Sequence, residues 1–211
     1  MKVVKPSVKI LSKTTYTGML RLIEKAGRTC YKSESKITSD SAESFVKNII
    51  KRGHESVLEH ASITIRIICD RGISHQLVRH RIASYSQEST VWCNYSKDKF
   101  NKQVTFIMPL FFYECLGKKT EYSVWKRAMK NAEDSYMELL KIGRTPAEAR
   151  SVLPNSLKTE VIMTMNIRAW REFFHKRYSI HVHPQMFQIT RMILDIFYKK
   201  YKIFFDDIQL T

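Results

Sequence analysis

The stretch HQLVRHRIASYSQESTVW, residues 75–92, concentrates side chains that bind anions. Gln76, Arg79 and His80 offer an amide, a guanidinium and an imidazole. We expect a short helix over residues 72–81 to bring them to one face, because they stand at i, i+3 and i+4. A guanidinium can bind phosphate or a carbonyl-rich ring through two hydrogen bonds, and an imidazole adds one that is tunable near neutral pH. The alternative is a basic helix end that only faces solvent.

Small polar residues follow this basic triplet and favour a binding site. Ser84, Ser86, Gln87, Glu88 and Ser89 suit turns and can hold a phosphate or the edge of a nucleobase. The net charge of +16, from 36 basic and 20 acidic residues, also predicts an anionic partner. Nucleic acid, a phosphorylated small molecule and a membrane surface all fit such a charge, which by itself does not choose among them.

A second polar group lies in GHESVLEH, residues 53–60. We expect His54, Ser56 and Glu59 to converge at a helix start. A competing interpretation is a zinc site formed by His54, Glu59 and His60. However, the histidines are six residues apart and lack the HExxH spacing that places ligands on one helical face, so we expect no metal. A plain helix cap with a hydrogen-bonded histidine is the third alternative.

Hydrophobic periodicity predicts the elements that must position these groups. The second expected helix has Ser39 or Ser41 as its N-cap and Gly53 as its stop. The strands are too scattered for a βαβ series, and no linker or repeat marks a boundary, so we expect one helix-rich α+β domain over residues 1–211. The expected strands are 3–12, 61–70, 103–108 and 157–167, and the expected helices are 15–31, 39–53, 72–81, 120–142, 145–152, 168–178 and 184–202.

Hydropathy and cysteine usage indicate the compartment. The sequence has no apolar run long enough for a membrane span and no signal-peptide pattern at its start, so we expect a soluble, cytoplasmic chain. The four cysteines lack CxxC spacing, which argues against a structural zinc site and suits a reducing compartment. We expect free thiols at Cys30, Cys69, Cys93 and Cys115.

Arg79-His80-Arg81, seven residues and then Ser89 resemble the signature of the flavin-dependent thymidylate synthases. Four further segments resemble that family in the same order, and together the five cover the chain from near its start to about residue 190. They are RTCYKS (28–33), GHESVLEH (53–60), ARSVLPNSLKTE (149–160) and MNIRAWREFFHKRYSIHVHPQM (165–186). The resemblance implies a central, mostly antiparallel sheet flanked by helices.

The resemblance also implies a role for individual residues. The catalytic residues would be Arg177 and Ser89. The deoxyuridine monophosphate (dUMP) would be bound by Gln76, Arg79, Gln87, Glu88, Ser89, Arg150 and Arg177. The FAD would be contacted by His54, Ser56, Glu59, Arg79, His80, Arg81, Asn166, Arg168 and Glu172. Glu172 is the weakest of these matches, since members of the family usually carry Asn there. From the residues alone, a surface ion pair of Arg150 with Glu148 or a neighbour is the favoured explanation.

The implied reaction is flavin-dependent methylation of uracil at C5. NADPH supplies hydride through FAD, 5,10-methylenetetrahydrofolate supplies the carbon, and no protein nucleophile attacks the base. None of the four cysteines lies in the Pro-Cys context that cysteine-dependent synthases require. Binding geometry and electrostatics would then carry catalysis, while the cofactor performs the hydride chemistry. The resemblance further implies a homotetramer with active sites between subunits.

Val91 departs from the family pattern, which has an arginine at this position. Loss of one guanidinium–phosphate contact costs about 1.5–3 kcal/mol, or about ten- to a hundredfold in affinity. Three explanations stay open: Lys97 or Lys99 compensates, the nucleotide binds in a different pose, or the chain is a paralogue that hydroxymethylates a uridylate.

The alternative from a different class is a basic nucleic-acid-binding domain. It is favoured by the charge and by alternating aromatic and basic residues in WREFFHKRY, residues 170–178. An amphipathic helix that buries Trp170, Phe173 and Phe174 explains the same pattern. We expect the enzyme, with no nucleic acid and no membrane as partner.

Overall fold

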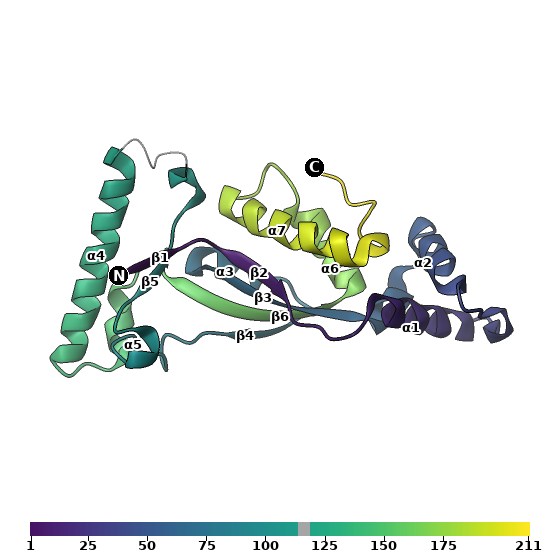
Figure 1. Ribbon diagram of the computed structural model, residues 1–211, viewed down its shortest axis with the longest axis horizontal. Helices are drawn as coiled ribbons and strands as arrows, with labels where there is room; N and C mark the ends of the chain where they lie inside the picture. The colour runs from purple at the N-terminus through teal and green to yellow at the C-terminus, as the bar shows by residue number, and fades with distance from the viewer. Residues whose placement is uncertain (114–118) are drawn as a thin grey trace. The chain divides into compact units, whose positions relative to one another are not determined.

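The computed structural model describes residues 1–113 and 119–211 (Figure 1). The chain divides into two compact units. Unit 1 comprises Met1–Ser7, Ile67–Arg79 and Ser86–Val161, and unit 2 comprises Val8–Arg66, His80–Tyr85 and Ile162–Thr211. The single-domain organisation expected from the sequence stays a prediction. The thiols of Cys30, Cys69 and Cys93 are free as expected, and Cys115 lies outside the described residues.

Two sheets are present in the described part of the chain. The larger has the strand order β2 (Ser7–Ile10), β3 (Ser62–Asp70), β6 (Lys158–Asn166), β4 (Ser84–Gln87). In the smaller, β1 (Lys2–Val4) pairs in parallel with β5 (Thr105–Ile107). The strand expected over 3–12 is therefore two strands, with Lys5 and Pro6 between them, because proline has no N–H to donate to a ladder.

The central pair β3 and β6 is antiparallel. The Ile167 N–H donates to the Ala61 carbonyl at 2.9 Å, and the hydroxyls of Thr64 and Thr164 lie 2.9 Å apart, so residue numbers fall along one strand as they rise along the other. Alternate residues of β3 are buried, including Ile63, as the spacing of isoleucines predicts. The expected α+β class with an antiparallel central sheet is confirmed.

Unit 2 carries four helices, α1 (Tyr16–Thr29), α2 (Ser41–Lys51), α6 (Ile167–Arg177) and α7 (Pro184–Tyr201), and three short 3-10 helices, η1 (Glu34–Lys36), η2 (Glu55–His60) and η7 (Lys202–Phe204). Asn166 caps α6 through a bond from the Ala169 N–H, and His183 caps α7 through one from the Gln185 N–H. The expected N-cap of α2 was wrong, because Asp40 stands there; the Ser41 hydroxyl instead accepts from the Thr38 N–H. Gly53, with φ of +68°, follows the end of α2 as expected.

Aromatic side chains fill the core of unit 2. Trp170, Phe173, Phe174 and Phe197 are fully buried, and their rings meet at centroid distances of 5.0–6.2 Å. The indole N–H of Trp170 donates to the Ile63 carbonyl at 3.1 Å, which fastens α6 to β3. The amphipathic-helix interpretation of residues 170–178 is thus confirmed, and these rings are not exposed for stacking on nucleobases.

Unit 1 is built around a second hydrophobic cluster that includes Tyr95, Phe106, Tyr136 and Leu157. Its helices are α3 (Arg71–Leu77), α4 (Lys119–Lys141) and α5 (Pro146–Ala149), and its 3-10 helices are η3 (Asp98–Phe100), η4 (Leu110–Phe112) and η6 (Arg150–Val152). Thr145 and Glu148 form a capping box at the start of α5, which confirms the helix start expected there. No helix in the described residues has the length and apolar character that a membrane span requires.

The helix expected over 72–81 is wrong in its last turn. Residue Asp70 caps α3 through the Ile73 N–H, but the helix ends at Leu77. Beyond it, the hydroxyl of Tyr85 donates to the His80 carbonyl at 2.7 Å, so this carbonyl is engaged by a side chain rather than by a helical N–H. Gln76, Arg79 and His80 consequently do not share a helical face.

Candidate functional site

Unit 2 contains a cavity of about 470 Å³ whose walls come from two of the sequence motifs. His54 and Ser56, both predicted from the sequence to bind flavin, line it. The remaining lining combines hydrogen-bonding groups with apolar surface, as is usual for sites that bind organic cofactors. These residues are Gly27, Cys30, Tyr31, Ser33, Phe45, Asn48, Ile49, Arg52 and Val57.

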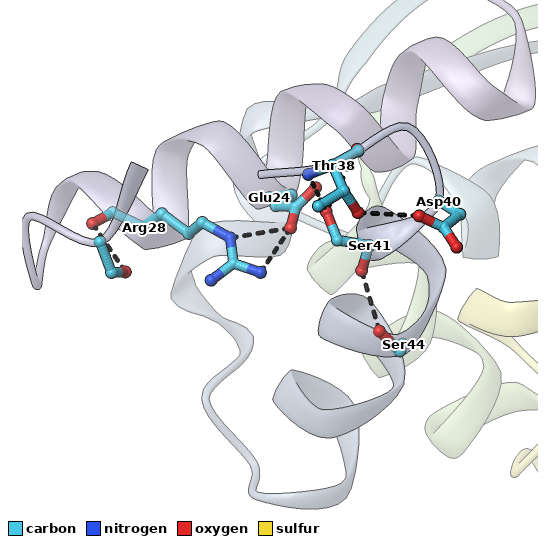
Figure 2. A network of polar contacts seen from close by, with 7 residues as sticks. Glu24, Arg28, Thr38, Asp40, Ser41 and Ser44 are labelled. Carbon is cyan, nitrogen blue, oxygen red and sulfur yellow. Dashed lines mark hydrogen bonds and ion pairs between the residues drawn. The ribbon is translucent and has the colours of Figure 1, made fainter. Parts of the chain in front are cut away.

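A buried ion pair on α1 flanks Gly27, which lines the cavity (Figure 2). Glu24 is buried and receives two bonds from the Arg28 guanidinium, at 2.8 and 2.7 Å. The same guanidinium lies 4.9 Å from the ring centre of Phe45. A Cβ added at Gly27 would come within 2.7 Å of that ring, so α1 and α2 can approach this closely only because residue 27 is glycine.

The loop that joins the two helices is held by short polar contacts. The Ser33 N–H and hydroxyl both reach the Arg28 carbonyl, and the Thr38 hydroxyl donates to Asp40 at 2.8 Å (Figure 2). Ser33 thus stays on the cavity wall.

The part of the wall that η2 provides is anchored by a buried arginine. The Arg171 guanidinium is only 3% exposed and donates to Glu55 at 2.8 Å, to both carboxylate oxygens of Asp207 at 2.7 Å and to the Phe204 carbonyl at 2.6 Å. Glu55 lies between His54 and Ser56 in the chain. Arg171 therefore fixes the segment that carries both predicted flavin residues.

His80 and Arg177 are directly bonded. The Nε–H of Arg177 donates to Nε2 of His80 at 2.9 Å, and the imidazole packs edge-on against Phe173 at 4.8 Å. Burial, reinforced by the positive charges of Arg177 and Lys176, lowers the pKa of His80 to about 4. The imidazole is neutral near pH 7, as an acceptor must be.

The other predicted flavin residues of unit 2 lie around the start of α6. Arg168 pairs with Glu59 at 2.7 Å, with both side chains about half exposed, which joins two predicted residues 109 positions apart. Asn166 uses its side-chain oxygen to cap α6. Glu172 pairs with Lys176 at 2.5 Å, and this bond lowers its pKa. Arg81 is exposed.

The predicted nucleotide residues, apart from Arg177, belong to unit 1. Gln87 donates to the hydroxyls of Ser74 and Thr159, at 2.9 and 3.1 Å. Arg150 donates to the Thr90 hydroxyl at 3.1 Å, while Glu148, its expected ion-pair partner, pairs with Arg144 instead.

The other predicted nucleotide residues of unit 1 differ in their exposure and in their hydrogen bonds. The Glu88 carboxylate accepts from the Tyr95 hydroxyl at 3.1 Å and pairs with Lys158 at 2.6 Å, so it is engaged within the protein. Ser89 is half-buried and its hydroxyl accepts from the Val91 N–H at 3.3 Å. Gln76 is half-buried and Arg79 is exposed.

Sequence reasoning missed Arg52, which lines the cavity, and Arg171, which anchors it. The amphipathic-helix interpretation of residues 170–178 names Trp170, Phe173 and Phe174 as the buried face and leaves Arg171 out. Its position directly after Trp170, within the buried arc of α6, was the available signal. The zinc alternative finds no support, because within residues 1–113 and 119–211 no three His, Cys, Asp or Glu side chains gather as a metal site would require.

Comparisons with known proteins show which family the sequence matches. The sequence model of the family described as "Thymidylate synthase complementing protein" matches residues 10–201. The flavin-dependent thymidylate synthase of Pyrococcus abyssi is 40% identical over 147 residues, covering 69% of this chain and 58% of that protein. The enzyme of the same name from Corynebacterium aurimucosum is 30% identical over 205 residues, covering 90% of this chain and 80% of its own length.

A solved structure shares the fold. The crystal structure of the UMP/dUMP methylase PolB from Streptomyces cacaoi, bound with 5-Br dUMP, superposes with a TM-score of 0.77 and 20% identity, over 97% of this chain and 95% of that one. The chain spans about three-fifths of the length of the Pyrococcus abyssi and Pyrococcus furiosus relatives, 58% and 62%. On the match to residues 10–201 and these identities, the chain belongs to the thymidylate synthase complementing protein family.

Proposed function

We propose that this protein is a flavin-dependent thymidylate synthase that converts dUMP to dTMP with 5,10-methylenetetrahydrofolate as carbon donor and NADPH as reductant. The observation that carries the proposal is the cavity of unit 2, which brings together RTCYKS and GHESVLEH, two motifs that the sequence separates by about 20 residues. The names of the relatives support the same activity.

The donor set of unit 2 fits a flavin nucleotide. The cavity offers Ser33, Asn48 and Ser56 as hydrogen-bonding groups, Arg52 as a cation for phosphate, and an apolar surface for a ring. His54, Ser56, Glu59, His80, Arg81, Asn166, Arg168 and Glu172 are the residues we assign to FAD, with Arg79 of unit 1. When bound, the flavin supplies hydride transfer, which no side chain of the protein can perform.

Arg177 and His80 would orient the nucleotide. Because neutral His80 accepts from Nε of Arg177, the plane of that guanidinium is fixed before substrate binds. A fixed cation beside a uracil carbonyl withdraws electron density from the ring and makes it easier to attack, without any covalent bond to the protein.

The phosphate of dUMP would be held by Arg150 and Ser89, with Gln76, Arg79, Gln87 and Glu88 completing the nucleotide site. Arg150 is exposed and donates to the neutral Thr90 hydroxyl, so this bond brings no counter-charge that would compete with a phosphate dianion. We further propose a cytoplasmic homotetramer with active sites between subunits.

The absorption spectrum of the purified protein tests the flavin. We expect flavin bands, either at once or after addition of FAD, and a weaker affinity for FAD in His54→Ala. Lys25→Ala, an exposed change on α1 outside the cavity lining, serves as the matched control. A colourless protein that ignores FAD would contradict the proposal.

Tritium release from C5-labelled substrate tests the reaction. We expect release from dUMP that depends on both NADPH and methylenetetrahydrofolate. UMP run in parallel tests the choice of sugar, and mass analysis of the product separates methylation from hydroxymethylation of a uridylate, the alternative motivated by Val91.

A further inference from the structure

A second cavity, of about 360 Å³, lies entirely in unit 1. Its walls come from β1, β5 and η3, with single residues of β2, β3 and β6. Four lysines line it, Lys2, Lys5, Lys99 and Lys158, and none of the residues assigned above to FAD or dUMP does. We call this cavity the lysine pocket.

The charge of the lysine pocket is largely uncompensated. No carboxylate lines it. Lys158 pairs with Glu88 at 2.6 Å, but among residues 1–113 and 119–211 no carboxylate forms an ion pair with Lys2, Lys5 or Lys99. About three positive charges therefore share one concave surface, where like charges repel and attract a counter-ion.

Aromatic rings hold two of these ammonium groups. Nζ of Lys5 lies 4.8 Å from the ring centre of Tyr113, and Nζ of Lys99 lies 5.1 Å from that of Phe100. Phe100 also lines the pocket and packs edge-on against buried Tyr95 at 5.0 Å. Both lysines are exposed, and these ring contacts restrain their ammonium groups at the pocket.

We propose that the lysine pocket binds a diphosphate group. Near pH 7 a diphosphate that bridges two nucleosides carries about two negative charges and free pyrophosphate about three, so three unpaired ammonium groups can neutralise either one. Ammonium groups act as point charges and need no fork geometry, which suits the many equivalent oxygens of a diphosphate.

Two components of the proposed reaction, FAD and NADPH, carry a diphosphate. The choice of one of them as the natural source of the diphosphate rests on the proposed function. The residues of unit 2 are already assigned to FAD, whereas no residue of the chain is assigned to NADPH. NADPH is therefore the source we favour.

Pyrophosphate binding, measured by calorimetry, tests the pocket directly and without catalysis. We expect Lys2→Gln/Lys99→Gln to bind pyrophosphate at least about tenfold more weakly than the unaltered protein. Lys25→Gln/Lys47→Gln changes the net charge equally at two lysines that do not line the pocket, and should bind almost as tightly as the unaltered protein. Equal thermal stability of the two variants shows that folding is not the cause.

Two outcomes would overturn the proposal. The first is that the unaltered protein does not bind pyrophosphate, or that the pocket and control variants bind it with equal affinity. The other is a parallel loss of dUMP affinity in the pocket variant, since the lysines would then hold the substrate's own phosphate.

The same variants identify the source of the diphosphate. A weaker affinity for NADPH with unchanged FAD binding assigns the pocket to the reductant, and weaker FAD binding assigns it to the flavin. If neither changes while pyrophosphate binding is lost, the ligand is a free diphosphate metabolite. If the protein takes up no FAD but still binds pyrophosphate through these lysines, the proposal for the pocket holds and only the proposed function is refuted.

Discussion

Nε2 of His80 accepts a hydrogen bond from Nε of Arg177 at 2.9 Å, across 97 residues of sequence. This bond joins a residue assigned to the flavin to a residue assigned to the nucleotide. Because one contact serves both, a change in the protonation of His80 would disturb both ligands. Buried Phe173 and the Tyr85 hydroxyl on the His80 carbonyl hold the imidazole in place.

The His80 pKa predicts how stability depends on pH. The pKa is about 4 in the folded protein and about 6.5 in an unfolded chain, so the unfolded state binds the extra proton between these values. The free energy of unfolding should fall as the pH drops from about 6.5 to 4, by on the order of 2 kcal/mol from this group after allowance for partial exposure.

Urea unfolding at several pH values measures this effect against His80→Gln, whose side-chain oxygen still accepts from Arg177. The variant should lose this part of the pH dependence and keep that of the carboxylates. An identical slope in the two proteins would show that His80 does not titrate as proposed.

Arg171 and Arg168 lie on the same helix. Replacement by methionine should lower the free energy of unfolding at Arg171 but leave it almost unchanged at Arg168. Arg171→Met leaves Glu55 and Asp207 without their buried partner and should lower the free energy of unfolding by about 3–5 kcal/mol. Arg168→Met breaks only an exposed pair and should leave stability almost unchanged while weakening FAD binding. Thermal unfolding with flavin titration separates the two, and equal losses of stability would contradict this distinction.

Gln87 is expected to have a structural role as well as a part in the nucleotide site. Its amide donates to Ser74 and Thr159, whose side chains are fully buried. Gln87→Leu should lower the free energy of unfolding by about 1–3 kcal/mol, because two buried hydroxyls lose a partner. Ser86→Ala, an exposed change one residue earlier, is the control. If Gln87→Leu unfolds at the same urea concentration as the unaltered protein, Gln87 has no structural role and serves only to bind ligand.

Val91→Arg tests whether a phosphate contact is missing. If it is, the substitution should raise dUMP affinity about ten- to a hundredfold, whereas Val91→Met, of similar length but uncharged, should not. Titration with dUMP measures both. No gain in Val91→Arg would favour compensation by another basic residue, with Lys97, which does not line the lysine pocket, as a candidate.

The sequence by itself determined the family, the α+β class and most elements, because hydrophobic periodicity, helix caps and motif order are local properties. It failed where a side-chain contact outside the helical pattern decides. Beyond Leu77 the His80 carbonyl is engaged by the Tyr85 hydroxyl, five residues on, and buried Arg171 is paired with Asp207, 36 residues away.

Tertiary structure alone decided which polar residues meet. The Arg168–Glu59 and Arg177–His80 contacts join segments about 100 residues apart, and the lysine pocket gathers side chains from residue 2 to residue 158. Spacing along the chain cannot predict such contacts, because hydrogen bonds and ion pairs depend on distances in space, which are set by how strands pair and helices pack.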